Sequence, residues 1–285
     1  MQVRKAVITA AAPDQTRIPT QQLVDQRGVE QSALQLILRE IQSCGVQETC
    51  IVVRPGDEAL FRQTAGEFET SLHFAVQPSP DGYADAILRA EPFVGNDAFL
   101  HLVGDHVYLS ETNSTCAEQL VEVAEELDCS VSAVQSTREN MLPLFGIVSG
   151  TRVARHEGVF EIQRVIEKPT PTMAEQELVT PGLRAGHYLG FFGMHVLTAD
   201  VLESLKQIKT DRESERPTLS DALDLYLHRH KYVAFEVKGR RHNLGVQYGL
   251  LMAQMAIGLA GSDRDRILTE LVDLLAVRQF GGAGQ

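Results

Sequence analysis

Apolar runs and helix-like segments alternate along the first 105 positions of the chain. Short apolar runs bounded by polar turns are typical of buried strands. Leu34, Ile37, Leu38 and Ile41 recur at the spacing of one helix face. This alternation predicts an α/β fold with a mostly parallel central sheet and helices on both faces. The predicted strands are Ala6–Ala12, Thr49–Val53, Leu72–Val76 and Phe99–Val103, and the predicted helices are Ser32–Cys44, one after Asp57, and Asp85–Ala90.

The pattern loosens in the second half. Phe145–Ser149 and Phe160–Ile166 are apolar runs separated by a polar, Gly-containing turn, which predicts a small β-hairpin insertion. Thr170–Gly186 is rich in Pro, Gly and Thr without periodicity, so we expect a surface loop. Further helices are expected at Ser114–Leu127, Ala199–Leu205, Leu219–His228 and Gly245–Leu259, and further strands at Ser130–Gln135, Tyr188–Val196 and Tyr232–Val237.

A polar break at Gly261–Asp263 precedes a last helix near Ile267–Val277. We therefore expect one domain over residues 1–256 and a helical extension over 257–285. The extension is expected to dock on its own domain, although a contact between two copies in a homo-oligomer stays open.

Composition argues against a nucleic-acid-binding protein and against a membrane-spanning one. The formal net charge of −12 argues against a general nucleic-acid binder, which would present a basic face. No stretch approaches the roughly 20 apolar residues that span a bilayer, and no signal peptide is evident. The four cysteines show no metal-ligand spacing, so we expect reduced thiols in a cytoplasmic protein.

The loop that leaves the first strand has the position of a phosphate-binding loop. Strand, loop and helix at the start of an α/β chain commonly cradle a phosphate. No glycine occurs between Lys5 and Gly28, however, and Pro13 and Asp14 lie at the tip of the loop. Lysine is absent from Ala6 to Glu167, so a cation from this half must be an arginine, and Arg17 is the one in the loop.

Three further stretches carry candidate chemistry, each with a purely structural alternative. Asp105 ends an apolar strand, where a carboxylate can hold a divalent cation or a ribose hydroxyl, or simply cap a turn. Lys168, fixed by the following proline, can reach a phosphate or lie in an exposed turn. Gln77 and Gly82 follow a strand and can approach a base edge, or form an ordinary loop.

Taken together, these stretches resemble the sugar-1-phosphate nucleotidyltransferases, most closely the bacterial UTP–glucose-1-phosphate uridylyltransferases, over about residues 3–256. The resemblance lies in the order and spacing of Ala6–Ala11 with Thr16-Arg17 and Pro19, of Gln77, Gly82 and Ala86, of Gly104-Asp105, of Gly146–Val148 with Glu167-Lys168-Pro169, and of Leu219–Ala222 with Gly239–Gly249. It implies a Rossmann-like, GT-A-like nucleotidyltransferase fold.

The resemblance also implies roles for individual residues. Arg17 and Lys168 would be catalytic, with Arg17 facing the triphosphate of UTP and Lys168 binding the phosphate of a sugar 1-phosphate. Magnesium would be the cofactor, held by Asp105 and Asn243. The remaining implied contacts are Ala11, Ala12, Thr16, Gln77, Gly82 and Asp105 to the nucleotide, and Gly146, Glu167 and Lys168 to the sugar phosphate.

Several positions depart from the family's pattern, and they lie on the reaction path. Pro13 and Gln15 replace loop glycines, and Asp14 adds a negative charge where a triphosphate would lie. The segment before Leu23 is shorter and lacks the Pro-Lys pair that carries the family's catalytic lysine, although Arg27 lies nearby. Asn243 stands in place of the second metal-binding aspartate, and Ala84-Asp85 in place of a glycine and its successor.

Three hypotheses follow. The first is nucleotide-sugar synthesis from UTP and a sugar 1-phosphate, chiefly glucose 1-phosphate, with Mg²⁺. The second is a non-catalytic homologue that binds a nucleotide or nucleotide sugar. The third is a glycosyltransferase of similar sheet topology, which would want an Asp-x-Asp-like metal site, whereas residues 104–106 supply one carboxylate.

Overall fold

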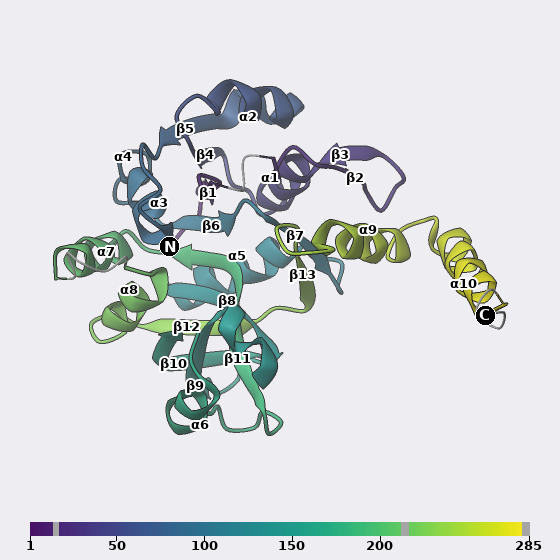
Figure 1. The fold of residues 1–285 in the computed structure, drawn as a ribbon. Helices are drawn as coiled ribbons and strands as arrows, with labels where there is room; N and C mark the ends of the chain where they lie inside the picture. Colours follow the sequence, from purple (N-terminus) through teal and green to yellow (C-terminus); the bar gives the residue numbers. More distant parts are fainter. Residues whose placement is uncertain (14–16, 212–216, 281–285) are drawn as a thin grey trace.

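One large sheet organises the molecule (Figure 1). The computed structural model describes residues 1–13, 17–211 and 217–280. In these ranges the main sheet has nine strands in the order β5-β4-β1-β6-β11-β8-β12-β10-β9. Its strands are β1 (Lys5–Thr9), β4 (Glu48–Val53), β5 (Leu72–Val76), β6 (Phe99–Val103), β8 (Ser130–Arg138), β9 (Gly146–Arg152), β10 (Val159–Glu167), β11 (His187–Leu197) and β12 (Tyr232–Glu236).

Strand direction agrees with the predicted mostly parallel sheet. The pairs β5–β4, β4–β1, β1–β6 and β8–β12 are parallel. Within the described part of the sheet, β11 and β10 run against their neighbours and make antiparallel ladders. The predicted hairpin of β9 and β10 is present, and its second strand also pairs with β12 as part of the main sheet.

Helices cover both faces of the sheet because its central strands are apolar on both sides. In β1, Ala6 and Ile8 point to one core and Val7 to the other, and all three are fully buried. The first core is covered by α1 (Ala33–Ser43), α2 (Glu58–Ala65) and α5 (Cys116–Leu127), and the second by α3 (Tyr83–Arg89), α7 (Asp200–Asp211) and α8 (Leu219–Tyr226). Short helical turns are α4 (Glu91–Val94), η1 (Gly66–Ser71) and η2 (Glu139–Leu144).

Two small hairpins lie outside the main sheet. β2 (Gln22–Val24) pairs with β3 (Glu30–Ser32), where the turn is closed by Asp25, whose Oδ1 accepts from the backbone N–H groups of Arg27 and Val29. β7 (His106–Ser110) pairs with β13 (Gly239–Asn243). This second pairing joins segments some 130 residues apart and sets Asn243 opposite His106. It brings the end of β13 beside the end of β6.

The segment 170–186 is not the continuous loop expected from its composition. It contains α6 (Pro171–Glu177), so that prediction is wrong. Thr170 caps the helix by accepting from the backbone N–H of Met173, and proline fits the first helical position. Ala174 and Leu178 are fully buried one turn apart in a small separate core. Two buried apolar residues are too few to produce a helical periodicity that can be recognised in the sequence.

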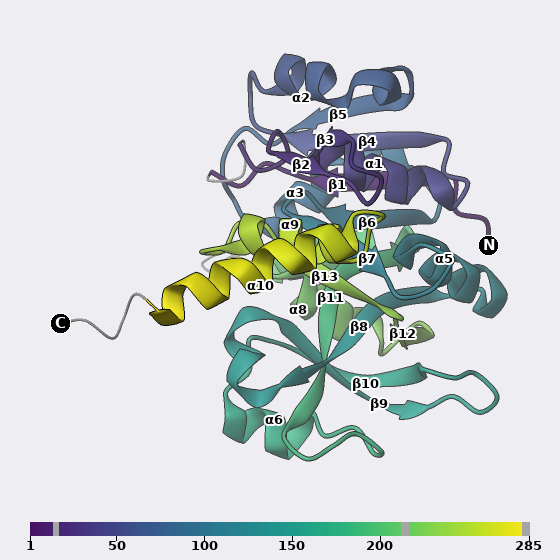
Figure 2. The same cartoon turned by 90° about the vertical axis from the view of Figure 1, so that its right-hand side faces the viewer.

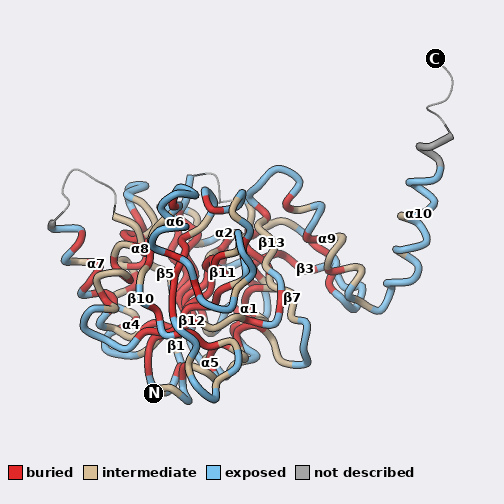
Figure 3. Tube along the Cα trace, turned by 90° about the horizontal axis from the view of Figure 1, so that it is seen from below, coloured by how far each residue is buried: buried red, intermediate tan, exposed pale blue. Residues whose placement is uncertain are grey.

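The last two helices leave the body of the molecule. α9 (Gly249–Leu259) packs on the β7–β13 hairpin, and α10 (Arg264–Phe280) packs on α9 and extends outward (Figures 1 and 2). The described residues of α10 are largely exposed (Figure 3). Leu274 is 65% and Leu275 66% exposed. Among the described elements α10 packs chiefly on α9, and its role, as a docked extension or as a contact between two copies, stays a prediction. Within the described residues, no helix is both long and apolar enough to cross a membrane.

Candidate active site

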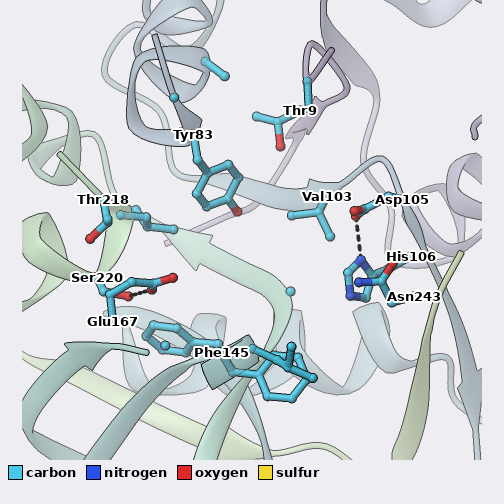
Figure 4. Close-up of a pocket in the computed structure, with 18 of the residues that line it drawn as sticks. Thr9, Tyr83, Val103, Asp105, His106, Phe145, Glu167, Thr218, Ser220 and Asn243 are labelled. Atoms are coloured by element: carbon cyan, nitrogen blue, oxygen red, sulfur yellow. Dashed lines mark hydrogen bonds and ion pairs between the residues drawn. The ribbon is translucent and has the colours of Figure 1, made fainter. Parts of the chain in front are cut away.

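A cavity of about 650 Å³ opens where β1, β5 and β6 end (Figure 4). Open α/β sheets bind ligands at the carboxyl ends of their parallel strands. Here Thr9 and Val103 are paired across β1 and β6, and both line the cavity. The opposite wall comes from β11, the start of α8 and the segment that joins η2 to β9. Nine of the eleven residues singled out in the sequence line it: Ala11, Ala12, Gln77, Gly82, Asp105, Gly146, Glu167, Lys168 and Asn243.

The opening loop is only partly positioned at this cavity. Ala11, Ala12 and Pro13 line it, and Arg54 donates from Nη1 to the carbonyl of Pro13 at 3.2 Å. Thr16 lies outside the described residues. Arg17 is exposed in a turn and is not among the described residues that line the cavity. The geometry therefore brings the backbone of this loop to the cavity without the Arg17 side chain.

Arg27, the other cation near the opening loop, is engaged elsewhere. Its guanidinium donates to Asp25 Oδ2 at 3.0 Å in the β2–β3 turn, and its side chain is 65% exposed. It is not among the described cavity-lining residues.

Gln77 and Gly82 form one end of the cavity, where α3 begins. Gly82 has φ +101°, which only glycine adopts readily. Gln77 is buried, and its Nε2 donates to the carbonyl of Gly82 and to Asp85 Oδ2, both at 3.0 Å. Asp85 is 3% exposed and also accepts from Arg89 and Lys209. Burial raises the pKa of Asp85, but hydrogen bonds from Lys209, Gln77 and Arg89 outweigh it and hold that pKa below its usual value.

Asp105, His106 and Asn243 meet at the other side of the cavity (Figure 4). Asp105 Oδ1 lies 2.6 Å from His106 Nδ1, and Asn243 Oδ1 accepts from the backbone N–H of Gly245 at 2.8 Å. A Cβ on Gly245 would lie 3.7 Å from Asp105 Oδ2 and 3.3 Å from Asn243 Oδ1. One oxygen of Asp105 and one of Asn243 thus lie within 4 Å of the position that a Cβ at residue 245 would take.

Asp105 and Asn243 offer two oxygen atoms of the kind that Mg²⁺ binds. Mg²⁺ is commonly bound by one or two protein oxygens, with water and substrate phosphate completing its octahedron. Among the described residues, no group of three or more His, Cys, Asp or Glu side chains is placed to hold a metal by itself. Asp105 and Asn243 would therefore supply part of a coordination shell that a bound phosphate completes.

Gly146, Glu167, Lys168 and Ser220 form the third part of the cavity. Ser220 donates from Oγ to Glu167 Oε2 at 2.6 Å (Figure 4). A Cβ on Gly146 would lie 2.5 Å from Ser220 Oγ and 2.6 Å from the Phe191 ring, so only glycine fits there. Lys168 adopts φ +46°, a left-handed conformation that is uncommon for a residue with a side chain. Its ammonium lies 3.9 Å from Glu167 and remains half-exposed.

Arg241 is a cavity-lining cation that the sequence did not single out. Its guanidinium carbon lies 3.7 Å from the centre of the Phe145 ring and 6.0 Å from that of Phe192. Burial lowers the pKa of Arg241 to about 10. No carboxylate in the described part of the chain lies within ion-pair distance of it. Alternate residues of a strand share a face, so its place two positions before Asn243 is the signal that could have found it.

Buried histidines support the floor of the cavity. His101 is fully buried, and Thr9 Oγ1 and Tyr83 Oη each lie 3.3 Å from one of its ring nitrogens. His195 lies beside it, 2.5 Å from Ser132 Oγ through Nδ1. Burial lowers the pKa of His195 to about 3 and that of His101 well below its ordinary value. Both rings are therefore neutral at physiological pH.

Comparison with known proteins gives one consistent family. A family model described as nucleotidyl transferase matches residues 16–257. The UTP–glucose-1-phosphate uridylyltransferase YngB of Bacillus subtilis is 27% identical over 300 residues, which cover 96% of both chains. A UTP–glucose-1-phosphate uridylyltransferase of Streptococcus pyogenes is 24% identical and covers 90% of this chain and 89% of its own.

Solved structures agree in fold. A UDP-glucose pyrophosphorylase complexed with UDP-glucose matches with a TM-score of 0.74 at 22% identity, over 90% of this chain and 98% of the other. A UTP-bound UGPase from Acinetobacter baumannii matches with a TM-score of 0.74 at 18% identity, over 95% and 99%. The described architecture is thus a nucleotidyltransferase fold, and the chain belongs to the nucleotidyl transferase family.

Proposed function

We propose that the cavity binds UTP and a sugar 1-phosphate and joins them into a nucleotide sugar with release of pyrophosphate. The observation that carries this proposal is the convergence of three groups in one cavity: Gln77 and Gly82, Asp105 and Asn243, and Glu167 and Lys168. They suit a base, a phosphate-bound cation and a sugar phosphate respectively. Membership of the nucleotidyl transferase family favours nucleotidyl transfer over glycosyl transfer.

In this reaction an oxygen of the sugar phosphate forms a bond to the α-phosphorus of UTP, and the bond from that phosphorus to the bridging oxygen of the β-phosphate breaks. Pyrophosphate leaves with the electron pair of the broken bond. Phosphoryl-type transfers need little covalent help from a protein, because positioning and offsetting of charge supply most of the acceleration. The side chains around the cavity are suited to those two tasks.

Charge balance supports the need for a metal. The described lining contains two side-chain cations, Lys168 and Arg241, and two carboxylates, Asp105 and Glu167. It is therefore close to neutral, whereas the two substrates together carry several negative charges. A magnesium ion held by Asp105 and Asn243 would neutralise part of the triphosphate. Lys168 would bind the sugar phosphate, and the Arg241 guanidinium, which lies over the Phe145 ring, would donate to a phosphate oxygen.

The sugar is proposed to lie against Glu167 and Ser220, whose mutual hydrogen bond presents an acceptor and a hydroxyl to sugar hydroxyls. Glucose 1-phosphate is the first candidate because the relatives from Bacillus subtilis and Streptococcus pyogenes are named for it.

A pyrophosphate-release assay over a panel of nucleoside triphosphates and sugar 1-phosphates tests the proposal. We expect turnover with UTP, Mg²⁺ and a sugar phosphate, and a loss of at least about a hundredfold in Lys168→Ala. Lys206→Ala is the matched control, because this exposed lysine pairs with Glu91 and Glu203 away from the cavity. Binding of UTP with no pyrophosphate released from any pair would overturn the transfer step.

A further inference from the structure

The side-chain amide of Gln77 is held in one orientation. Its Nε2 has two hydrogens, and each is used: one bonds to the carbonyl of Gly82 and the other to Asp85 Oδ2, both at 3.0 Å. Both partners are acceptors, so the NH₂ group must face them and the carbonyl oxygen must point away. A flipped amide would set Gln77 Oε1 against a carbonyl and a carboxylate.

Oε1 of Gln77 is left as the one hydrogen-bonding atom that this side chain can offer a ligand. In the described part of the chain no donor is recorded within hydrogen-bond distance of it, and the enclosed side-chain polar atoms without a partner are Gln31 Oε1 and His242 Nε2. Gln77 Oε1 is therefore not enclosed. Gln77 as a whole is only 4% exposed and it lines the cavity, so we infer that Oε1 faces the cavity.

Asp85 is the residue that fixes this arrangement. It lies on the first turn of α3, its side chain is 3% exposed, and Arg89 and Lys209 hold it from two different helices at 3.1 and 2.6 Å. Two cations keep the carboxylate ionised and stationary. An ionised carboxylate can only accept hydrogen bonds, so it cannot tolerate the flipped amide.

We propose that Asp85 is a specificity-determining residue that selects the base of the nucleotide by locking Gln77 as an acceptor. A base with an N–H at the position facing Oε1 is accepted, and a base with a lone pair there is rejected. Uracil carries N3–H at the middle of its pairing edge, whereas cytosine carries an unprotonated N3. The same lock admits thymine, whose pairing edge equals that of uracil.

The inference rests on the proposed function, since it takes the Gln77 end of the cavity as the base subsite. The inference adds to the proposed function the residue that lets this subsite distinguish uracil from cytosine. Asparagine at position 85 could instead donate to Gln77 Oε1, which would permit the flipped amide and provide a donor for cytosine N3.

Isothermal titration of wild type and variants with UTP and with CTP, in Mg²⁺ and without a sugar phosphate, tests the lock independently of turnover. Wild type is expected to prefer UTP by about tenfold or more, because an acceptor facing a lone pair forfeits a buried hydrogen bond. In Asp85→Asn the preference is expected to fall several-fold. Lys209→Gln is the control: it removes one of the two ion pairs of Asp85 but leaves position 85 unable to donate, so the preference should stay.

If the ratio of the UTP and CTP affinities is unchanged in Asp85→Asn, or changes equally in Lys209→Gln, the proposed role of Asp85 is wrong. The proposed transfer reaction is not affected by that result. A wild-type protein that binds neither nucleotide overturns both. Should Asp85→Asn fail to fold, Asp85→Ser replaces it, because its hydroxyl can also donate.

Discussion

Replacing Arg241 with methionine tests whether this arginine binds substrate or stabilises the fold. The two quantities to compare are the free energy of unfolding and the affinity for UTP. Methionine is long and apolar enough to keep contact with the Phe145 ring, but it removes the charge. A guanidinium that merely held the fold together would cost stability when replaced. One held in the cavity for a phosphate should cost affinity instead.

The structure sets the magnitudes. Burial lowers the pKa of Arg241 to about 10, which corresponds to about 3 kcal/mol of unfavourable desolvation of the charged form, fully present at pH 7.5 because the group is protonated in both the folded and the unfolded chain. Stacking on Phe145 at 3.7 Å returns about 2 kcal/mol at most. The free energy of unfolding of Arg241→Met should therefore stay unchanged or rise by about 1 kcal/mol.

Affinity should move the other way. A charge-assisted hydrogen bond to a phosphate oxygen contributes about 1.5–3 kcal/mol, so the dissociation constant of UTP should rise about tenfold to a hundredfold. Urea unfolding and isothermal titration with UTP measure the two quantities. Arg240→Met is the control. The Arg240 side chain, next to Arg241 in the sequence, is 69% exposed and pairs with Glu111, so the stability and the UTP affinity should both change little. A variant that loses more than about 1 kcal/mol of stability and still binds UTP within twofold of wild type would refute the reasoning.

Three further predictions concern single positions. Gly245→Ala should raise the Mg²⁺ concentration for half-maximal activity about tenfold with little loss of stability, because its methyl group would lie within 4 Å of Asp105 Oδ2 and Asn243 Oδ1, the proposed metal-binding oxygens. Gly146→Ala should destabilise the fold by about 1–3 kcal/mol in urea unfolding, and raise KM for the sugar phosphate more than KM for UTP, because the methyl group meets Ser220 and the neighbouring ring. His101 and His195 are buried in the neutral form, so below pH about 6.5 the unfolded chain binds protons that the folded chain does not. The free energy of unfolding should therefore decrease as the pH is lowered. Between pH 6 and pH 4.5, His195→Gln should lessen this decrease by up to about 1.4 kcal/mol per pH unit.

Each of these has a result that would contradict it. An unchanged Mg²⁺ dependence in Gly245→Ala would remove the proposed metal position. Equal rises in both KM values for Gly146→Ala would mean a general distortion of the cavity. For His195→Gln, urea midpoints that fall with pH as steeply as those of wild type would show that other groups dominate the acid sensitivity.

The sheet strands were predictable because burial on both faces leaves continuous apolar runs. Leu72–Val76 and Phe99–Val103 have the same bounds in the sequence analysis and in the structure. The position of Asp105 followed from the second run, since a polar residue directly after a buried parallel strand lies at the ligand-binding edge of the sheet. Local patterns thus placed the parts of the site that lie on or next to these strands.

Contacts between distant segments could not be predicted in the same way. Arg241 reaches the cavity through the pairing of β13 with β7, and nothing near either strand in the sequence indicates that partner. The Gln77–Asp85 bond joins a strand end to a helix start across a turn set by a glycine with positive φ. The left-handed backbone of Lys168 likewise becomes visible only in three dimensions.

Transfer of label from UTP carrying ³²P at its α-phosphorus tests the central claim most directly. Incubation with glucose 1-phosphate and Mg²⁺ should move the label into a nucleotide sugar, with one equivalent of unlabelled pyrophosphate released for each label transferred, and no transfer should occur without the sugar phosphate. Label that remains wholly in UTP under conditions in which titration shows both substrates bound would contradict the account.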